Sequence, residues 1–258
     1  MKPILAFDVD GVLVDSEHEI ILTSWNEHNF WRKSKGLDAQ PFTLKFSEIP
    51  AEYINLYKRF RKHSNKNYYR IAINLLMFGG IDPDKITSDV VKQISEANES
   101  EITEIKKRIK DIRKRLHSEA DLNEVFHPYA AVDYQWIEQL HAKGQVYFIT
   151  NNPGSLTGFK HIAFQPDEKH IRTDEAGISD KSIHLNEIIE KEGINPASIL
   201  FIDDSLQSLQ EVHKGTDIPI SNIIHNTWAP ASKKLPADSG FPDLDFDAIK
   251  KHFLSLGE

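Results

Sequence analysis

Two aspartates two residues apart, Asp8 and Asp10, follow an apolar run near the start of the chain, within ILAFDVDGVLVDSE. Carboxylates that end a buried strand cost desolvation free energy unless a cation or hydrogen-bond donors compensate their charge. Alternate residues of an extended segment point to the same side, so both carboxylates are expected to face one site. Gly11 then interrupts the strand pattern. The stretch therefore predicts an acidic site with a positively charged partner.

A second pair of acids, Asp203 and Asp204, follows another apolar run much later in the chain, in LFIDDS. Mg²⁺ prefers oxygen ligands, and it commonly binds in proteins through one or two carboxylates, waters and a substrate phosphate. The two acidic pairs together therefore predict a Mg²⁺ site that handles a phosphate ester.

Phosphoryl transfer needs a nucleophile, an acid for the leaving oxygen, and positive charge near the three equatorial oxygens. Asp8 can act as the nucleophile and form an aspartyl-phosphate. Asp10 can then protonate the leaving group and afterwards activate water. The two carboxylates are expected to differ in role because their surroundings differ.

Phosphate-binding groups are expected at the end of a third apolar run, in VYFITNN, where Thr150, with Asn151 and Asn152, offers a hydroxyl and backbone N–H groups. Lys181, at a predicted helix start, offers a cation. Lys160 and Lys169 are alternatives to Lys181, because they also lie between Thr150 and Asp203 in the sequence.

The elements that must position these groups are three runs with the composition of buried parallel strands, at Ile4–Phe7, Val146–Thr150 and Ile199–Ile202. Helical periodicity at 130–144 and 179–193 separates them, and each helical stretch closes with a glycine. Ligands of open α/β sheets bind at the carboxyl ends of the strands. The chain is therefore predicted to be an α/β protein with a Rossmann-like parallel sheet.

Helical periodicity without strand patterns marks a long insertion between the first strand and the rest of the sheet. We expect an α/β core of residues 1–15 and 126–258 and an all-helical domain of residues 16–125. Within the insertion, apolar residues recur at spacings of three and four: Ile102, Ile105, Ile109, Ile112 and Leu116. This seam is too short for a coiled coil and is expected to pack on neighbouring helices of the insertion.

Basic side chains are concentrated in two stretches of the insertion. Seven decorate the isoleucine-rich stretch: Lys106, Lys107, Arg108, Lys110, Arg113, Lys114 and Arg115. They are interpreted as a solvated outer face. Residues 57–70 combine six basic side chains with three tyrosines and no acid. That stretch either holds an anionic substrate or is plain surface.

Composition narrows the classes of function. The 258 residues are 40% hydrophobic and 27% charged, as expected of a folded chain, and the net charge of -8 disfavours nucleic acid as a partner. No apolar stretch approaches the roughly 20 residues that span a bilayer, and Asp8 and Asp10 interrupt the early apolar run. The absence of cysteine excludes disulfides and thiolate chemistry. A cytoplasmic protein is expected, and its oligomeric state is left open.

These motifs resemble the haloacid dehalogenase superfamily, in its phosphatase and phosphomutase branch. FDVDGVLVDSE is similar to the first motif of the family, VYFITNN to the second, SDKSIHL to the third and LFIDDS to the fourth, in the same order. The resemblance covers most of the chain outside the insertion, which would be the helical cap that closes over the site. Ser208 stands where members with a single fourth-motif acid carry another aspartate, so this chain is similar to the paired-acid variant.

Residue roles follow from the resemblance. It implies Asp8 as nucleophile and metal ligand, and Asp10 as general acid and base with its backbone carbonyl on the metal. It implies Asp204 as a direct metal ligand and Asp203 as a ligand directly or through water. Thr150 and Lys181 would complete the catalytic set, and Mg²⁺ would be the cofactor.

The expected activity is hydrolysis of a small phosphorylated metabolite, dependent on Mg²⁺. A phosphomutase with the same aspartyl-phosphate is an alternative, in which a bound sugar accepts the phosphoryl group. A catalytically silent binding or regulatory protein is a second alternative, although intact motifs count against it. A dehalogenase needs no metal, so Asp10 and the Asp203–Asp204 pair disfavour that option.

Overall fold

The computed structural model describes residues 2–61, 73–74, 85, 87–173, 180–229 and 235–257. The chain divides into two compact units, one formed by Met1–Ser16 with Phe126–Glu258 and the other by Glu17–Val125. We call them the sheet unit and the helical unit. The expected boundary after residue 15 lies one residue before the observed one.

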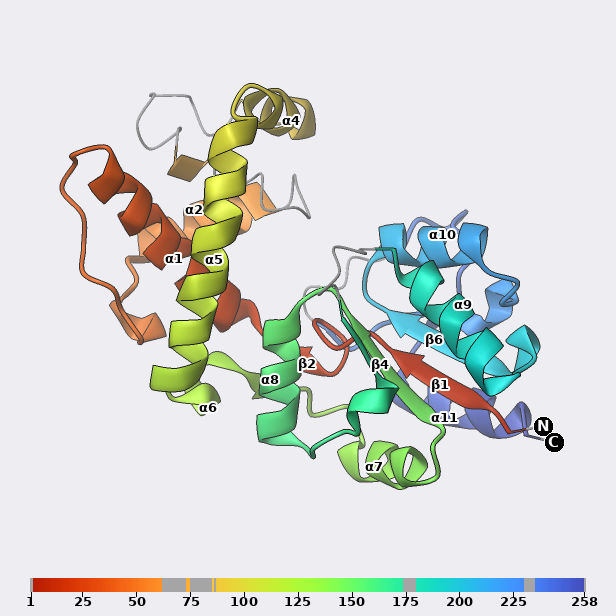
Figure 1. Cartoon of the computed structure of the whole chain (residues 1–258). Helices are drawn as coiled ribbons and strands as arrows, with labels where there is room; N and C mark the ends of the chain where they lie inside the picture. The colour runs from red at the N-terminus through yellow and green to blue at the C-terminus, as the bar shows by residue number, and fades with distance from the viewer. Residues whose placement is uncertain are drawn as a thin grey trace. The chain divides into compact units, whose positions relative to one another are not determined.

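The sheet unit is built on six parallel strands in the order β5-β4-β1-β6-β7-β8 (Figure 1). The strands are β1 (Ile4–Phe7), β4 (Val146–Thr150), β5 (Ile171–Thr173), β6 (Ile199–Asp203), β7 (Ile223–Asn226) and β8 (Asp243–Leu244). The three apolar runs form the neighbouring strands β4, β1 and β6, all fully buried. The expected Rossmann-like sheet is therefore confirmed. The chain reverses its direction of strand addition at β1, which is where ligand crevices of such sheets lie.

Helices cover both faces of this sheet. They are α7 (Tyr134–Ala142), α8 (Pro153–Ile162), α9 (Lys181–Glu192), α10 (Leu206–Gly215) and α11 (Phe246–Ser255), with one-turn 3-10 helices η3 (Glu168–His170), η5 (Pro196–Ser198) and η6 (Ile220–Asn222). Leu185 of α9 and Leu209 of α10 pack with Ile149 on one face. Phe148 points to the other face and packs on Phe159 of α8. The alternation along each strand thus gives both faces an apolar layer.

Capping residues start and end α9 as the sequence pattern predicts. The Asp180 side chain accepts a hydrogen bond from the Ser182 N–H, and Gly193 ends the helix in the left-handed conformation, at φ +62°. The cap matters for the site, because it sets the start of α9 at Lys181.

A short two-stranded antiparallel sheet joins the two segments of the sheet unit. Strand β2 (Val14–Asp15) pairs antiparallel with β3 (His127–Pro128), and Asp15 lies opposite His127. The chain therefore leaves for the helical unit and returns from it at adjacent positions.

The helical unit contains α1 (Glu17–Ser34), η1 (Phe46–Glu48), α2 (Ala51–Arg61), α4 (Ser88–Glu96), α5 (Glu99–Glu119) and α6 (Leu122–Val125). All five seam residues of α5 are buried, and α5 packs on α1 and α4. The interpretation as a packing stripe is confirmed. Within the part of the chain that the structure describes, no helix is long and apolar enough to cross a membrane.

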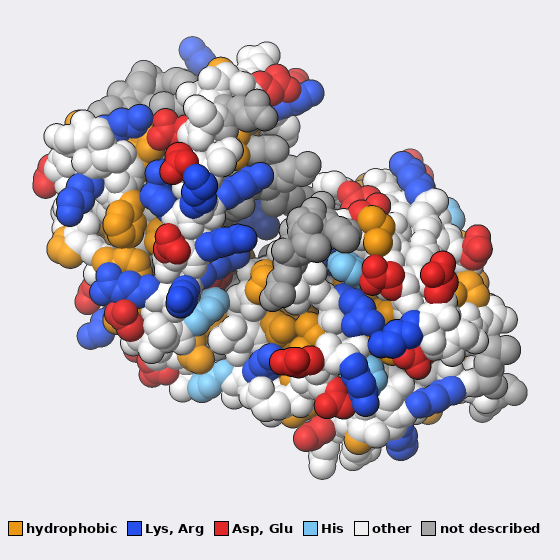
Figure 2. Space-filling model, in the orientation of Figure 1, with side chains coloured by type: hydrophobic (Ala, Val, Ile, Leu, Met, Phe, Trp, Pro, Cys, Tyr) orange, Lys and Arg blue, Asp and Glu red, His pale blue; other side chains and the backbone are white. Residues whose placement is uncertain are grey.

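The basic face of α5 is only partly solvated. Figure 2 shows Lys and Arg side chains gathered over this helix. Arg108, however, lies 2.8 Å from Glu27, and Arg113 lies 3.0 Å from Glu19, and both glutamates of α1 are fully buried. The expectation of a purely solvated face is wrong for these two arginines, because they compensate buried carboxylates. Of the second basic stretch, residues 62–70 lie outside the described residues.

Candidate active site

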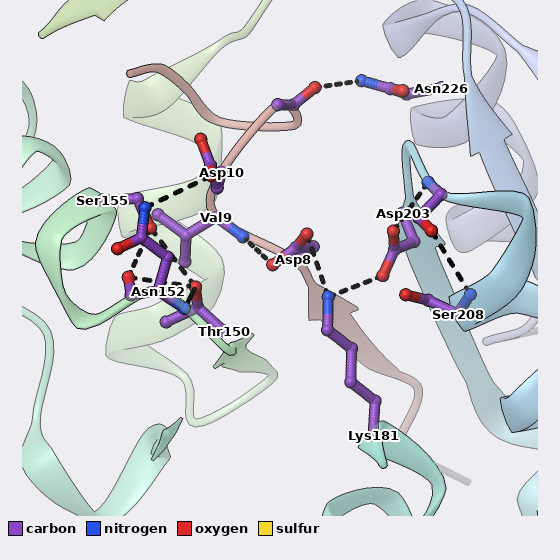
Figure 3. Close-up of polar contacts among 12 residues, drawn as sticks. Asp8, Val9, Asp10, Thr150, Asn152, Ser155, Lys181, Asp203, Ser208 and Asn226 are labelled. Atoms are coloured by element: carbon purple, nitrogen blue, oxygen red, sulfur yellow. Dashed lines mark hydrogen bonds and ion pairs between the residues drawn. The ribbon is translucent and has the colours of Figure 1, made fainter. Parts of the chain in front are cut away.

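The carboxylate of Asp8 lies at the carboxyl end of β1 and is nearly buried, at 7% exposure. Its Oδ1 accepts a hydrogen bond from the Val9 N–H at 2.8 Å. Its Oδ2 lies 2.9 Å from Lys181 Nζ, which also donates to Asp203 Oδ2 at 2.7 Å (Figure 3). Both oxygens of Asp8 are therefore held in place, and the expected positive partner is Lys181.

The acids of the second pair lie at the end of β6, beside Asp8. Asp203 is fully buried, and its second oxygen accepts a hydrogen bond from the Ser205 N–H at 2.8 Å. Asp8, Asp203 and Asp204 each bring a carboxylate oxygen within 4.8 Å of the others. Three carboxylates and the Lys181 ammonium leave a formal charge of about -2, which a hard dication such as Mg²⁺ would balance.

Burial and the neighbouring charges both shift the pKa values of these groups. Burial raises the pKa of the Asp8 carboxyl well above its ordinary value; Lys181 opposes this rise, and Asp203 and Asp204 add to it. Burial alone would lower the pKa of the Lys181 ammonium, but Asp203 and Asp8 hold it above its ordinary value. The site therefore keeps Lys181 charged and is short of positive charge around Asp8.

Gly11 leaves room for Asp204. Its φ is +77°, and a Cβ at this position would lie 2.5 Å from Asp204 Oδ2. A side chain here would strain the backbone and force the Asp204 carboxylate to move. The glycine after the first acidic pair is thus required by the second acidic pair.

Asp10 makes contacts of its own. Strand β1 ends at Phe7, so Asp8 and Asp10 lie in the loop that follows it and not within one strand. The Asp10 carboxylate accepts hydrogen bonds from the Ser16 hydroxyl and, at 3.3 Å, from Asn152 Nδ2. The two aspartates therefore have different environments, as their predicted roles require.

The turn after β4 carries the expected phosphate-binding residues. Thr150 is fully buried, and its hydroxyl accepts a hydrogen bond from the Asn152 N–H at 3.0 Å and lies 3.2 Å from Ser155 Oγ (Figure 3). Asn151 is exposed at the strand end. Asn152, expected to offer a backbone N–H, also links this turn to Asp10 through its side chain and caps α8.

The loop after Asp10 is fixed by side chains that sequence reasoning missed. Each donates to a backbone carbonyl: Asn226 to Gly11 at 2.9 Å, Trp228 to Val12 at 2.8 Å and Tyr134 to Leu13 at 2.6 Å. Asn226 ends β7, so the available signal was a polar residue at the carboxyl end of a strand. That signal was missed because the short strand IIHN was not recognised.

The lysine alternatives are separated by position. Lys181 is 3% exposed and contacts two of the acids, whereas Lys169 is exposed beside Asp167 and Lys160 lies in the last turn of α8. Ser208 lies in the first turn of α10, where its N–H donates to the Ser205 hydroxyl at 3.4 Å. The structure therefore gathers Asp8, Lys181, Asp203 and Asp204 into one cluster.

Comparisons with known proteins agree with this architecture. The family model of haloacid dehalogenase-like hydrolases matches residues 3–210. A structure from Lactobacillus delbrueckii subsp. bulgaricus with the provisional name phosphoglycolate phosphatase is 15% identical, with a TM-score of 0.58 over 98% of both chains. A predicted phosphoglycolate phosphatase from Haemophilus somnus is 18% identical, with a TM-score of 0.56 over 97% of both chains.

A structure from Thermotoga maritima with the provisional name beta-phosphoglucomutase is 16% identical, with a TM-score of 0.56 over 96% of this chain and 99% of that one. These likenesses show a shared fold. No curated protein sequence matches this chain. Because the family model covers most of the chain, including the acids after β1 and β6, the chain belongs to the haloacid dehalogenase-like hydrolases.

Proposed function

We propose that the chain is a phosphatase that hydrolyses a small phosphorylated metabolite through an aspartyl-phosphate on Asp8. The observation that carries the proposal is the buried Asp8 carboxylate, held by Lys181 and the Val9 N–H beside two further acids. Membership in a hydrolase family supports the reaction type. The phosphatase names of similar folds support a phosphate ester as the substrate class.

The reaction divides into two transfers. In the first, an Asp8 oxygen attacks phosphorus, the bond to the leaving oxygen breaks, and Asp10 gives that oxygen a proton. In the second, Asp10 takes a proton from water as the water oxygen attacks the phosphoryl group. The bond between phosphorus and the Asp8 oxygen breaks, inorganic phosphate leaves, and both carboxyl groups return to their starting states.

Contacts seen in the structure prepare these roles. The hydrogen bonds from Ser16 and Asn152 restrict the Asp10 side chain, so its proton is delivered from a defined position. Lys181 compensates negative charge on Asp8 and the incoming phosphoryl oxygens, and Asp203 keeps its ammonium aimed at Asp8. The Thr150 hydroxyl and the Asn151 N–H would add hydrogen bonds to phosphoryl oxygens.

The donor set fits Mg²⁺ as the cofactor. Carboxylate oxygens of Asp8 and Asp204 would hold it, together with the backbone carbonyl of Asp10. Asp203 would support it without direct ligation, because its oxygens already accept hydrogen bonds from Lys181 and Ser205. When bound, Mg²⁺ supplies positive charge for the phosphoryl oxygens and relieves repulsion among the acids.

A phosphate-release assay on a panel of phosphate esters tests the proposal. Release is expected with Mg²⁺, absent with EDTA, lost in Asp8→Asn, and unchanged in Asp217→Asn, an exposed acid of the same unit. Isomerised ester without released phosphate, detected by ³¹P NMR, would identify a phosphomutase instead. Binding without any turnover across the panel would identify a silent member and contradict the mechanism.

A further inference from the structure

A second cluster of metal-ligating side chains lies at the opposite end of the sheet from Asp8. His141 is in the last turn of α7, shortly before β4 begins. Asp167 precedes η3, and His170 is the last residue of η3, directly before the first residue of β5. The three residues therefore sit at the amino ends of strands, whereas the acids of the candidate active site follow the carboxyl ends. The two clusters are separate.

The ligand atoms have a spacing that suits one shared ion. His141 Nε2 and His170 Nδ1 are 3.3 Å apart, and His141, Asp167 and His170 each offer a ligand atom within 4.8 Å of the other two. Zinc–nitrogen bonds of about 2.0–2.1 Å in a tetrahedral site place neighbouring nitrogen ligands roughly 3.3 Å apart. The two imidazoles already have that separation.

Aromatic packing holds the two rings in this arrangement. The His141 and His170 rings meet edge-on, at 84° and 5.0 Å between centroids. Tyr147 packs edge-on against His170 at 4.9 Å, and Phe164 lies 5.3 Å from His141. Burial lowers the pKa of both histidines. The two imidazole rings would therefore lose little conformational freedom when an ion binds.

We propose that His141, His170 and Asp167 bind a divalent first-row transition-metal ion such as Zn²⁺. Two imidazoles and one carboxylate form a donor set for Zn²⁺ rather than for Mg²⁺, which takes oxygen ligands. The three residues line a pocket of about 380 Å³ together with Lys2, Lys191 and Glu192. A fourth ligand, water or a small anion, can therefore enter from solvent.

Such an ion would replace the 3.3 Å hydrogen bond between the two imidazoles and two further contacts. His141 Nε2 accepts from the Asp167 N–H at 3.2 Å, and Lys169 Nζ lies 3.3 Å from Asp167 Oδ2. The Lys169 side chain is 65% exposed, so it can swing away from the carboxylate at small cost. A bound ion would tie the end of α7 to the segment before β5 and stabilise the folded sheet unit.

Metal titration of the full chain tests this proposal. The protein is stripped with EDTA and titrated with Zn²⁺ by calorimetry in a large excess of Mg²⁺, and Co²⁺ absorption reports coordination by nitrogen. Thermal unfolding is followed with and without one equivalent of Zn²⁺. The variants are His141→Gln, His170→Gln and the exposed Asp167→Asn; His213→Gln, an exposed histidine of α10, is the matched control.

We expect one equivalent of Zn²⁺ to bind the unaltered protein and His213→Gln alike and to raise their unfolding temperature. Each ligand variant should weaken binding by about tenfold or more, since even the partners of metal ligands contribute that much. Asp204→Asn should keep this site. Absence of Zn²⁺ binding in excess Mg²⁺, binding that survives His141→Gln and Asp167→Asn, or binding lost in Asp204→Asn would overturn the proposal. The first result would leave only a hydrogen-bonded histidine pair.

Discussion

Residues of the same type have unlike roles in the acidic site because each has different neighbours. Asp8 faces a lysine, Asp203 faces that lysine and a backbone N–H, and Asp204 lies over a glycine. Asp10 instead receives a hydroxyl and an amide. Their chemistry thus follows from contacts, and substitutions at Asp8 and Gly11 probe those contacts directly.

Asp8→Asn should abolish turnover, by about a thousandfold or more, while the fold persists. It should also flatten the pH dependence of stability. Burial raises the folded-state pKa of Asp8, so folding favours its protonated form. The contribution of Asp8 to the free energy of unfolding is therefore full below its ordinary pKa of 3.8 and falls as the pH rises from there towards the raised folded-state pKa. Urea unfolding of both proteins in EDTA across this range measures the difference. Parallel pH profiles would contradict the expectation.

Gly11→Ala should weaken Mg²⁺ binding and activity, because the new methyl group displaces the Asp204 carboxylate. Gly193→Ala is the matched control: it is also left-handed, at φ +62°, with nothing within 4 Å of an added Cβ. Both changes should destabilise the protein by about 1–2 kcal/mol through backbone strain. Calorimetric Mg²⁺ titration should separate them, and equal affinities would refute the steric argument.

Elements bring the chemistry together in both units. Strands β1, β4 and β6 end at the site. Asn226 at the end of β7, Trp228 after it and Tyr134 in α7 hold the loop that follows Asp10. In the helical unit, α5 contributes an apolar seam to the interior and two arginines to buried acids of α1. The pairing of α1 with α5 is thus both apolar and ionic.

Arg108→Met should destabilise the helical unit by about 1–3 kcal/mol, because the fully buried Glu27 loses an ion-pair partner at 2.8 Å. Lys110→Met, on the exposed side of the same helix, should change stability by less than about 0.5 kcal/mol. Chemical denaturation followed by circular dichroism compares the two. A loss as large in Lys110→Met would mean that helix propensity, and not the ion pair, is responsible.

At the scale of the whole molecule, the chain forms two compact units, and it passes from one to the other next to the paired strands β2 and β3. We propose that the helical unit is a cap, the part of the protein that selects the leaving group. The sheet unit carries every residue of the acidic cluster, so the chemistry and the selection of substrate would be divided between the units.

Replacing residues 17–125 with a two-residue hairpin turn should leave a folded sheet unit, because Asp15 and His127 are already paired. The shortened protein should keep Mg²⁺ binding and lose discrimination among phosphate esters. Circular dichroism, Mg²⁺ calorimetry and a substrate panel test this expectation. A shortened protein that folds but keeps the full selectivity would place the selecting residues in the sheet unit.

Sequence patterns anticipated the long, apolar parts of the fold and missed the short ones. Four- and five-residue runs such as ILAF and VYFIT are unambiguous because they are buried on both faces. The three-residue β5 and the polar end of β7 carry too little pattern to be recognised. Arg108 and Arg113 were read as solvated, because the spacing of charges along one helix does not reveal acids on another.

The sequence by itself was sufficient to identify the acids, the lysine and the strand ends that carry them. Residue chemistry and strand periodicity are properties of short segments, so they can be recognised without the tertiary structure. Long-range packing assigned their partners: Lys181 to Asp8 and Asp203, Asn152 and Ser16 to Asp10, and Gly11 to Asp204. Such pairings depend on strand order and on the position of each helix start. Both are decided by burial of the whole sheet and not by neighbours in sequence.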